Sequence, residues 1–233
     1  MILRDNSVRA QQAVGFFQAL AVVLLLEIVL NFWYISQLST GHVPNNVDAS
    51  NGLFLVHNLL PLLGLVLLIT CLVMMIRWLR RAYWNLHAQQ LYLAHSEGWA
   101  AGAWFVPFLN MFRPYSIVKE VWRQTQLVAY ERVAPHVLLR VWWVIFLLRS
   151  VVSNITGRMV TEATTVTQLE NSAWGTILTA TLGLATAVLT MRVVQRIAGF
   201  EEQMSLRLQV AQLGGPAPSP AAELAEDQSD FEY

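Results

Sequence analysis

The chain has 233 residues, of which 55% are hydrophobic and only 13% are charged, and its mean hydropathy is +0.46. Soluble domains carry about 25% charged residues, so this composition excludes an ordinary soluble domain and indicates a protein with several membrane spans. The net charge is zero, and no overall field therefore favours nucleic acid as a partner.

Four apolar segments approach or exceed the length of about 20 residues that a helix needs to cross a membrane. They cover residues 13–35, 53–76, 137–155 and 173–191. Two Lys or Arg residues precede the first span, seven lie in the 77–136 loop and three follow residue 191, whereas Arg158 alone lies in the other two loops. The positive-inside rule then predicts that both termini and the 77–136 loop are cytoplasmic.

Two spans contain an ionisable residue at similar depth. Glu27 in the first span and Arg149 in the third each lie roughly 20 Å from the cytoplasmic boundary, at about 1.5 Å per helical residue. An unpaired charge at this depth costs several kcal/mol, so we expect the two to pair inside the bundle. A proton or ion relay is one alternative, and an outward-reaching Arg149 with a protonated Glu27 is another. In the second span, Pro61 and Gly64 predict a kink close to His57.

The loop between the second and third spans begins with basic residues whose heads can meet anionic lipid phosphates, with topology anchoring as the alternative. They are Arg77, Arg80 and Arg81. An aromatic segment interrupted by Pro107 and Pro114 follows, and residues 99–132 are predicted to lie at the membrane interface. Within them, Ser116 is expected to cap an amphipathic helix that Pro135 terminates.

The fourth span carries a small residue at every fourth position, a pattern that lets another helix approach closely. The positions are Gly175, Thr179, Gly183 and Ala187. This face packs either within the chain or against a second copy. Residues 192–212 continue the helix with one apolar face, built on Ile197, Phe200, Met204, Leu208 and Ala211. That face needs a partner, which is either the 77–136 loop or another chain. Residues 213–233 form an acidic, Pro-rich tail that we expect to be disordered, which leaves 1–212 as the transmembrane domain.

The loop sequence from Trp78 to Trp122 resembles a bacterial membrane-protein family known only as a domain of unknown function, with four spans and the signature W-x-x-G-x-W-F-x-P-x-x-N-x-x-x-P. This resemblance implies an inner-membrane location and the following motif positions: Arg80, Ala82, Asn85, Trp99, Gly102, Trp104, Pro107, Asn110, Pro114 and Trp122. The family has no established activity to transfer.

The motif residue types favour a docking element. Gly102 permits a close helix approach, Pro107 breaks the helix, and Asn110 or Asn85 can bond the carbonyl group that Pro107 leaves free. The segment acts either as a structural plug at the cytoplasmic end of the bundle or as a site for a lipid headgroup or small ligand.

The sequence contains no nucleophile elbow, no HExxH pair and no phosphate-binding glycine loop. We therefore expect no catalytic residues, no metal site and no cofactor. The predicted fold is all-α, with four membrane spans, a cytoplasmic aromatic hairpin that is interfacial or re-entrant, and an amphipathic helix. The predicted function is a non-catalytic accessory protein that docks on a membrane partner or on itself. The alternatives are a small oligomeric transporter or channel that uses Glu27 and Arg149, and lipid or ligand binding at the hairpin.

Overall fold

The computed structural model describes residues 3–40 and 52–214, and all regular structure in these ranges is helical. The elements are α1 (Ser7–Ser39), α2 (Gly52–Ala88), α3 (Trp99–Gly102), the 3-10 turn η1 (Leu109–Met111), α4 (Arg113–Tyr130), α5 (Val137–Glu162) and α6 (Val166–Gln212). The all-α prediction is confirmed. The predicted tail lies, from residue 215 onward, outside the described residues.

Helices α1, α2, α5 and α6 are long and apolar enough to cross a membrane, which confirms four spans. Leu62, Val66 and Ile69 of α2 are 55–60% exposed, an apolar surface that lipid favours and water does not. The chain is a membrane protein. Helix α6 contains both the predicted fourth span and the predicted C-terminal helix. Its 47 residues measure about 70 Å against a hydrocarbon core of about 30 Å, so only part of α6 can span.

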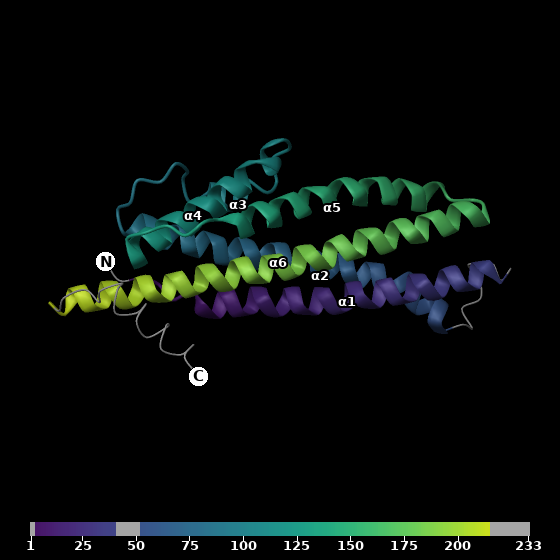
Figure 1. Cartoon of the computed structure of the whole chain (residues 1–233), viewed down its shortest axis with the longest axis horizontal. Helices are drawn as coiled ribbons and strands as arrows, with labels where there is room; N and C mark the ends of the chain where they lie inside the picture. Colours follow the sequence, from purple (N-terminus) through teal and green to yellow (C-terminus); the bar gives the residue numbers. More distant parts are fainter. Residues whose placement is uncertain (1–2, 41–51, 215–233) are drawn as a thin grey trace, which may run out of the picture. The chain divides into compact units, whose positions relative to one another are not determined.

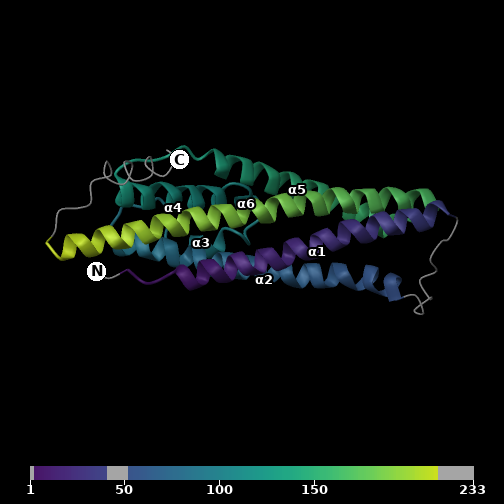
Figure 2. The same ribbon diagram turned by 60° about the horizontal axis from the view of Figure 1, so that its bottom comes forward.

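The chain divides into two compact units, which are described separately. Unit 1 comprises residues 3–7, 79–136 and 195–214 of the described chain, and unit 2 comprises residues 8–40, 52–78 and 137–194. Helices α2 and α6 contribute residues to both units. Figure 1 shows the elements in sequence colours, and Figure 2 shows the same ribbon after rotation.

In unit 2, α5 and α6 form an antiparallel seam with contacts at steps of seven or eight residues. The Trp142 indole donates to the Thr190 hydroxyl at 2.9 Å, and the Thr156 hydroxyl donates to the Gly175 carbonyl at 3.2 Å. A Cβ atom at Gly183 would lie 3.1 Å from Nε of Arg149. Since Trp142, Arg149 and Thr156 are seven residues apart, one stripe of α5 faces α6 along most of its length.

The start of α6 follows from its local sequence. The Thr165 hydroxyl accepts a hydrogen bond from the Gln168 backbone N–H at 3.3 Å, and the Gln168 side-chain oxygen accepts from the Thr165 N–H at 3.1 Å. This reciprocal pair is a capping box, which satisfies N–H groups that the first helical turn leaves without partners. The turn between α5 and α6 needs only residues 163–165 as a result.

In unit 1, α4 packs against the C-terminal part of α6. Ile197 is fully buried and Met204 is 1% exposed, while the Phe200 ring meets Trp122 edge-on with ring centroids 5.0 Å apart. The apolar face of α6 therefore finds its partner in the 77–136 loop of the same chain, one of the two predicted possibilities.

Both predicted ends of the amphipathic helix are wrong. Helix α4 begins at Arg113 with Pro114 in its first turn, so Ser116 lies inside the helix and does not cap it. The helix ends at Tyr130, because Glu131 adopts a left-handed conformation with φ of 58° and closes the last turn. The terminating residue is thus Glu131, four positions before Pro135.

Candidate interaction surface

The aromatic hairpin, defined as residues 99–112, presents large apolar side chains to the outside of unit 1. Phe108 is 82% exposed, Phe112 69%, Phe105 68% and Met111 44%. Scattered exposed apolar residues are normal in proteins, but these four and Val106, which is 37% exposed, place five exposed large apolar side chains within eight positions of one loop. This exposed edge is the main candidate for an interaction surface in unit 1.

Phe108 has a backbone conformation that L-amino acids with bulky side chains rarely adopt. Its φ is 64° and its ψ is −42°. Such a conformation costs about 1–3 kcal/mol and persists only where the surrounding structure imposes it. The turn is fixed on both sides, since the Leu109 N–H donates to the Pro107 carbonyl at 2.8 Å and the Asn110 N–H donates to the Val106 carbonyl at 3.0 Å. The chain therefore holds an exposed aromatic ring in place at a conformational cost.

The base of the hairpin is held by a cation–π contact. The Arg113 guanidinium lies over the Trp99 ring, 4.0 Å from its centroid. Gly102 does not admit another helix, because a Cβ atom there would meet only the Trp99 ring, at 3.8 Å. Pro107 does not interrupt a helix, since α3 already ends at Gly102 and Pro107 lies in the turn before η1. Both predicted roles are therefore wrong.

A partly buried hydrogen-bond network anchors the loop that leads into the hairpin. The Tyr83 hydroxyl donates to Glu120 at 2.6 Å and accepts from the His95 N–H at 3.1 Å, while the Ala94 N–H donates to the same Glu120 carboxylate at 2.7 Å. Burial, together with the Glu120 charge, raises the pKa of Tyr83, which therefore stays a neutral donor. The loop segment before α3 is thus tied to both α2 and α4.

Asn85 belongs to a second polar cluster, and its predicted role near Pro107 is wrong. Its side-chain oxygen accepts the Arg4 N–H at 3.1 Å, and its amide nitrogen donates to the Arg4 carbonyl at 3.0 Å and to Glu201 at 3.4 Å. Asn6 donates to both oxygens of Glu201, at 3.0 and 3.3 Å. Burial raises the pKa of Glu201 to about 7, although the two amides favour the ionised form. Asn85 thus secures the N-terminal segment.

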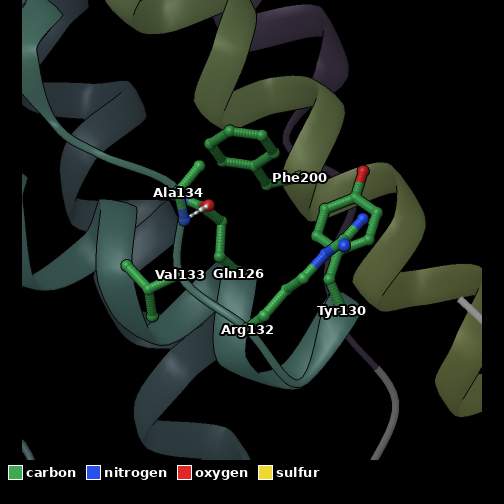
Figure 3. Close-up of a pocket in the computed structure, with 6 residues that line it drawn as sticks. All are labelled: Gln126, Tyr130, Arg132, Val133, Ala134 and Phe200. Atoms are coloured by element: carbon green, nitrogen blue, oxygen red, sulfur yellow. Dashed lines mark hydrogen bonds between the residues drawn. The ribbon is translucent and has the colours of Figure 1, made fainter.

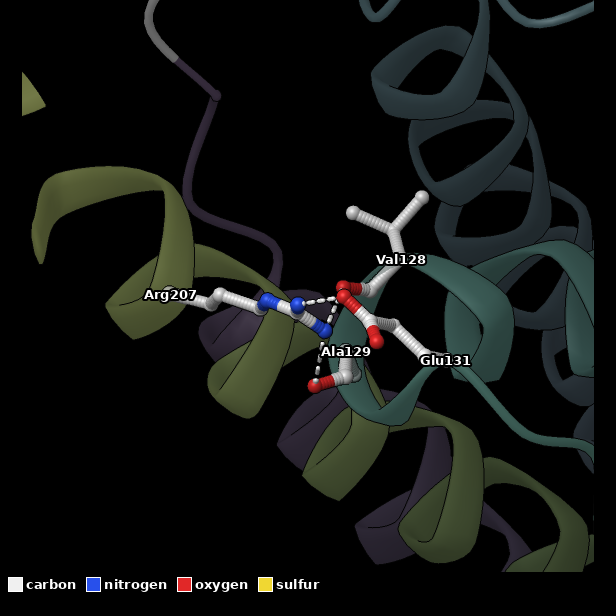
Figure 4. A network of polar contacts seen from close by, with 4 residues as sticks. All are labelled: Val128, Ala129, Glu131 and Arg207. Carbon is white, nitrogen blue, oxygen red and sulfur yellow. Dashed lines mark hydrogen bonds and ion pairs between the residues drawn. The ribbon is translucent and has the colours of Figure 1, made fainter. Parts of the chain in front are cut away.

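The C-terminal end of α4 is capped by an arginine from α6, as Figure 4 shows. The Arg207 guanidinium donates to the carbonyls of Val128 at 3.2 Å and Ala129 at 3.3 Å, and it forms an ion pair with Glu131. These carbonyls have no helical partners, and a cation at this end also complements the helix dipole. Arg207 therefore fixes the end of α4 to α6.

The remaining motif residues and the basic residues after the second span have separate surroundings. Arg80 forms an exposed ion pair with Glu97 at 3.2 Å, and Arg77 contacts the Met74 sulfur at 3.9 Å. Arg81 lies 6.0 Å from the centroid of a neighbouring tryptophan ring. Other motif residues are buried or half-buried: Ala82, Trp104, Pro114 and Trp122. Pro107 and Asn110 are exposed.

In unit 2, Glu27 and Arg149 each lie against a glycine of a neighbouring helix. A Cβ atom at Gly64 would lie 3.1 Å from the Glu27 carboxylate, and one at Gly183 would lie 3.1 Å from Nε of Arg149. Within the described part of the chain no ion pair joins Glu27 and Arg149, although they lie close enough to interact electrostatically. The predicted direct contact is therefore not observed, because each side chain occupies the space that a different glycine leaves.

The small-residue face of α6 is used inside unit 2. Gly175 contacts Thr156, whose hydroxyl also accepts a hydrogen bond from Thr179 at 3.0 Å. Gly183 lies against Leu24 as well as Arg149, and Ala187 is 1% exposed. Of the two predicted uses of this face, the structure shows packing within the chain.

Two important residues of unit 1 were missed by the sequence analysis, namely Glu201 and Arg207. Each is a charged residue on the helical continuation of the fourth span, where charges are expected to face water. A weak signal existed, because Glu201 follows the apolar residue Phe200 and lies four residues after Ile197, on the apolar face. Among residues 3–40 and 52–214, no group of His, Cys, Asp or Glu residues could hold a metal ion.

Comparison with protein families identifies the chain at the family level. The model described as a domain of unknown function, DUF4328, matches residues 44–199, which include three of the four spans and the whole hairpin. The chain belongs to the DUF4328 family. Neither curated proteins nor solved structures provide a match. The resemblance predicted from the loop sequence is thus confirmed. In this DUF4328 protein, however, Arg4, Asn6 and Glu201 lie outside the matched residues, so they complete the Asn85 cluster from beyond the family domain.

Proposed function

We propose that this DUF4328 protein is a non-catalytic accessory protein of the bacterial inner membrane, with both termini in the cytoplasm. It docks through the aromatic hairpin on an integral membrane partner or on a second copy of itself. The observation that carries this proposal is the exposed edge formed by Phe105, Phe108, Met111 and Phe112. Burying such residues contributes about 1.5–3 kcal/mol each, enough to hold a partner.

The backbone at Phe108 favours a protein surface over lipid tails as the binding partner. Lipid tails are fluid and adapt to any apolar side chain, so membrane insertion alone does not require a strained turn. A protein partner offers a groove of fixed shape, and a preorganised ring binds such a groove without a further ordering cost. Anionic lipid headgroups near Arg77 and Arg81 are proposed as additional contacts on the cytoplasmic side.

The test is site-specific photo-crosslinking in native membranes. A benzophenone side chain replaces Phe105 or Phe108, and the matched control carries it at Tyr92, which is 93% exposed but lies outside the hairpin. We expect one defined protein adduct from both hairpin positions and none from the control. The adducted protein must also co-purify with the wild-type chain and be lost with Phe105→Ser/Phe108→Ser. Lipid adducts alone, or equal adducts from position 92, would refute the proposal.

A transporter or channel is the second candidate, and the two ionisable residues of unit 2 favour it. Within the described residues, the Glu27 and Arg149 side chains form no hydrogen bond or ion pair, and ionisable groups inside spans commonly mark ion or proton pathways. Flux measured in proteoliposomes tests this. Loss of flux in the folded Glu27→Gln and Arg149→Gln proteins would support a pathway, whereas absence of flux in the wild-type protein for each ion tried would count against it.

A further inference from the structure

Unit 1 contains a pocket of about 360 Å³ between the end of α4, the following loop and α6 (Figure 3). Its lining residues are Gln126, Tyr130, Arg132, Val133, Ala134 and Phe200. The volume falls within the range of small-molecule sites, which is about 300–1,000 Å³. The pocket lies apart from the exposed edge of the aromatic hairpin, and the proposed docking function makes no use of it.

The walls of the pocket are fixed by hydrogen bonds and by an aromatic contact. The Gln126 side chain donates to the Trp122 carbonyl at 3.0 Å and accepts the Ala134 N–H at 2.8 Å, so both of its polar groups already have partners. The Tyr130 and Phe200 rings meet edge-on, with centroids 6.1 Å apart. These contacts hold the Gln126, Tyr130 and Phe200 side chains in place around the pocket.

Arg132 supplies the pocket with a positive charge. It points to the same side of the loop as Tyr130 in Figure 3, and within residues 3–40 and 52–214 it forms no hydrogen bond or ion pair. The acidic neighbour Glu131 is already paired with Arg207, so it does not neutralise Arg132. A guanidinium group offers a planar set of N–H donors that binds phosphate oxygens in pairs.

The pocket thus combines one free guanidinium group with aromatic and aliphatic walls. A free phosphate ion would leave these walls without apolar contacts, whereas an anionic phospholipid offers a phosphate group joined to apolar chains. Arg132 also precedes the first residue of α5 by only five positions, in the flanking region where basic residues meet lipid headgroups. We propose that this pocket binds the phosphate headgroup of an anionic phospholipid, with Arg132 as the phosphate ligand and Tyr130 and Phe200 against its apolar part.

The experiment measures lipid binding to the delipidated full-length protein in a non-ionic detergent by native mass spectrometry, with phosphatidylglycerol as the probe. The test variant is Arg132→Gln. The matched control is Arg123→Gln, which removes an exposed cation from α4 that does not line the pocket. A charge-assisted hydrogen bond contributes roughly 1.5–3 kcal/mol, so we expect Arg132→Gln to weaken binding about 10-fold to 100-fold. The control should change it less than about twofold.

Three outcomes would overturn the proposal. Equal losses in the two variants would show general attraction of lipid to positive charge, and unchanged binding in Arg132→Gln would exclude this residue. Displacement of phosphatidylglycerol by inorganic phosphate, with the same dependence on Arg132, would show a site for free phosphate. Phe200→Leu provides a further arm, because it keeps an apolar side chain in the α6 face. It should weaken lipid binding while tryptophan fluorescence reports an intact fold, and unchanged binding would contradict the proposed apolar contact.

Discussion

Replacement of Glu201 by glutamine should make the stability of unit 1 less dependent on pH. In the folded protein, Glu201 has a pKa of about 7 instead of 4.5, chiefly because it is buried. The folded state therefore binds the proton more strongly than the unfolded state. This group stabilises the fold below pH 4.5, and that contribution is lost as the pH rises through 7.

The size of the effect follows from the same two pKa values. At 1.36 kcal/mol per pH unit, the loss between pH 4.5 and 7 amounts to about 3 kcal/mol. Glutamine keeps one oxygen that can accept from Asn6 and Asn85, but its NH₂ group replaces the second acceptor. We therefore expect Glu201→Gln to be about 1 kcal/mol less stable than wild type at pH 4.5 and about 2 kcal/mol more stable at pH 8.

The assay is thermal unfolding in a non-ionic detergent, followed by tryptophan fluorescence between pH 4.5 and 8.5. For a chain of this size, 1 kcal/mol corresponds to about 2–4 °C, so the difference between the two proteins should change by about 6–12 °C across the range. The matched control is Glu202→Gln, because Glu202 is the exposed neighbour on the same helix. Parallel curves for wild type and Glu201→Gln, or the same change in the control, would refute the role assigned to the buried carboxyl group.

Two further predictions concern the helix contacts. Gly183→Leu should destabilise the protein by about 1–3 kcal/mol through overpacking, because even a Cβ atom added there would lie 3.1 Å from the Arg149 side chain. Gly199→Leu should instead stabilise the protein by about 0.5–1 kcal/mol, since nothing lies within 4 Å of a Cβ atom added at that position. Equal changes in melting temperature for the two leucine variants would contradict the close packing at Gly183. Thr190→Val should lower the free energy of unfolding by about 1–3 kcal/mol, because it leaves the buried Trp142 indole N–H without a partner. Thr181→Val removes only a bond within its own helix and should have a clearly smaller effect in the same melt.

The elements that the sequence predicts well are those determined by local pattern. The four spans follow from apolar length, and the continuation of the fourth helix follows from the spacing of Ile197, Phe200 and Met204. The partner of that face depended on tertiary structure, because the sequence alone does not show that α4 lies beside it. The capping of α4 was misread for the same reason. The Glu131 backbone and Arg207, which is 76 positions away, end this helix, whereas Pro135 was only the nearest local signal.

The intramembrane charges show how residue type can identify important positions without identifying their neighbours. Opposite charge at equal depth suggested that Glu27 contacts Arg149. Packing determines the arrangement instead, since α1 meets α2 where Gly64 leaves space and α5 meets α6 where Gly183 does. Glu27 and Arg149 could contact each other only if the helices brought both side chains to the same point. The seven-residue register of α5 against α6 instead places Arg149 beside Gly183.

The Asn85 cluster shows that folded unit 1 includes residues outside the matched family domain. The match ends at residue 199, whereas Asn85 obtains its partners from Arg4 and Glu201, at sequence distances of 81 and 116 residues. Loss of the N-terminal segment would remove two of the three side-chain hydrogen bonds of Asn85, and loss of the α6 segment would remove the third. Unit 1 is therefore complete only when the segments flanking the matched domain are present. The aromatic hairpin, although it lies wholly within residues 44–199, rests on a unit that extends beyond them.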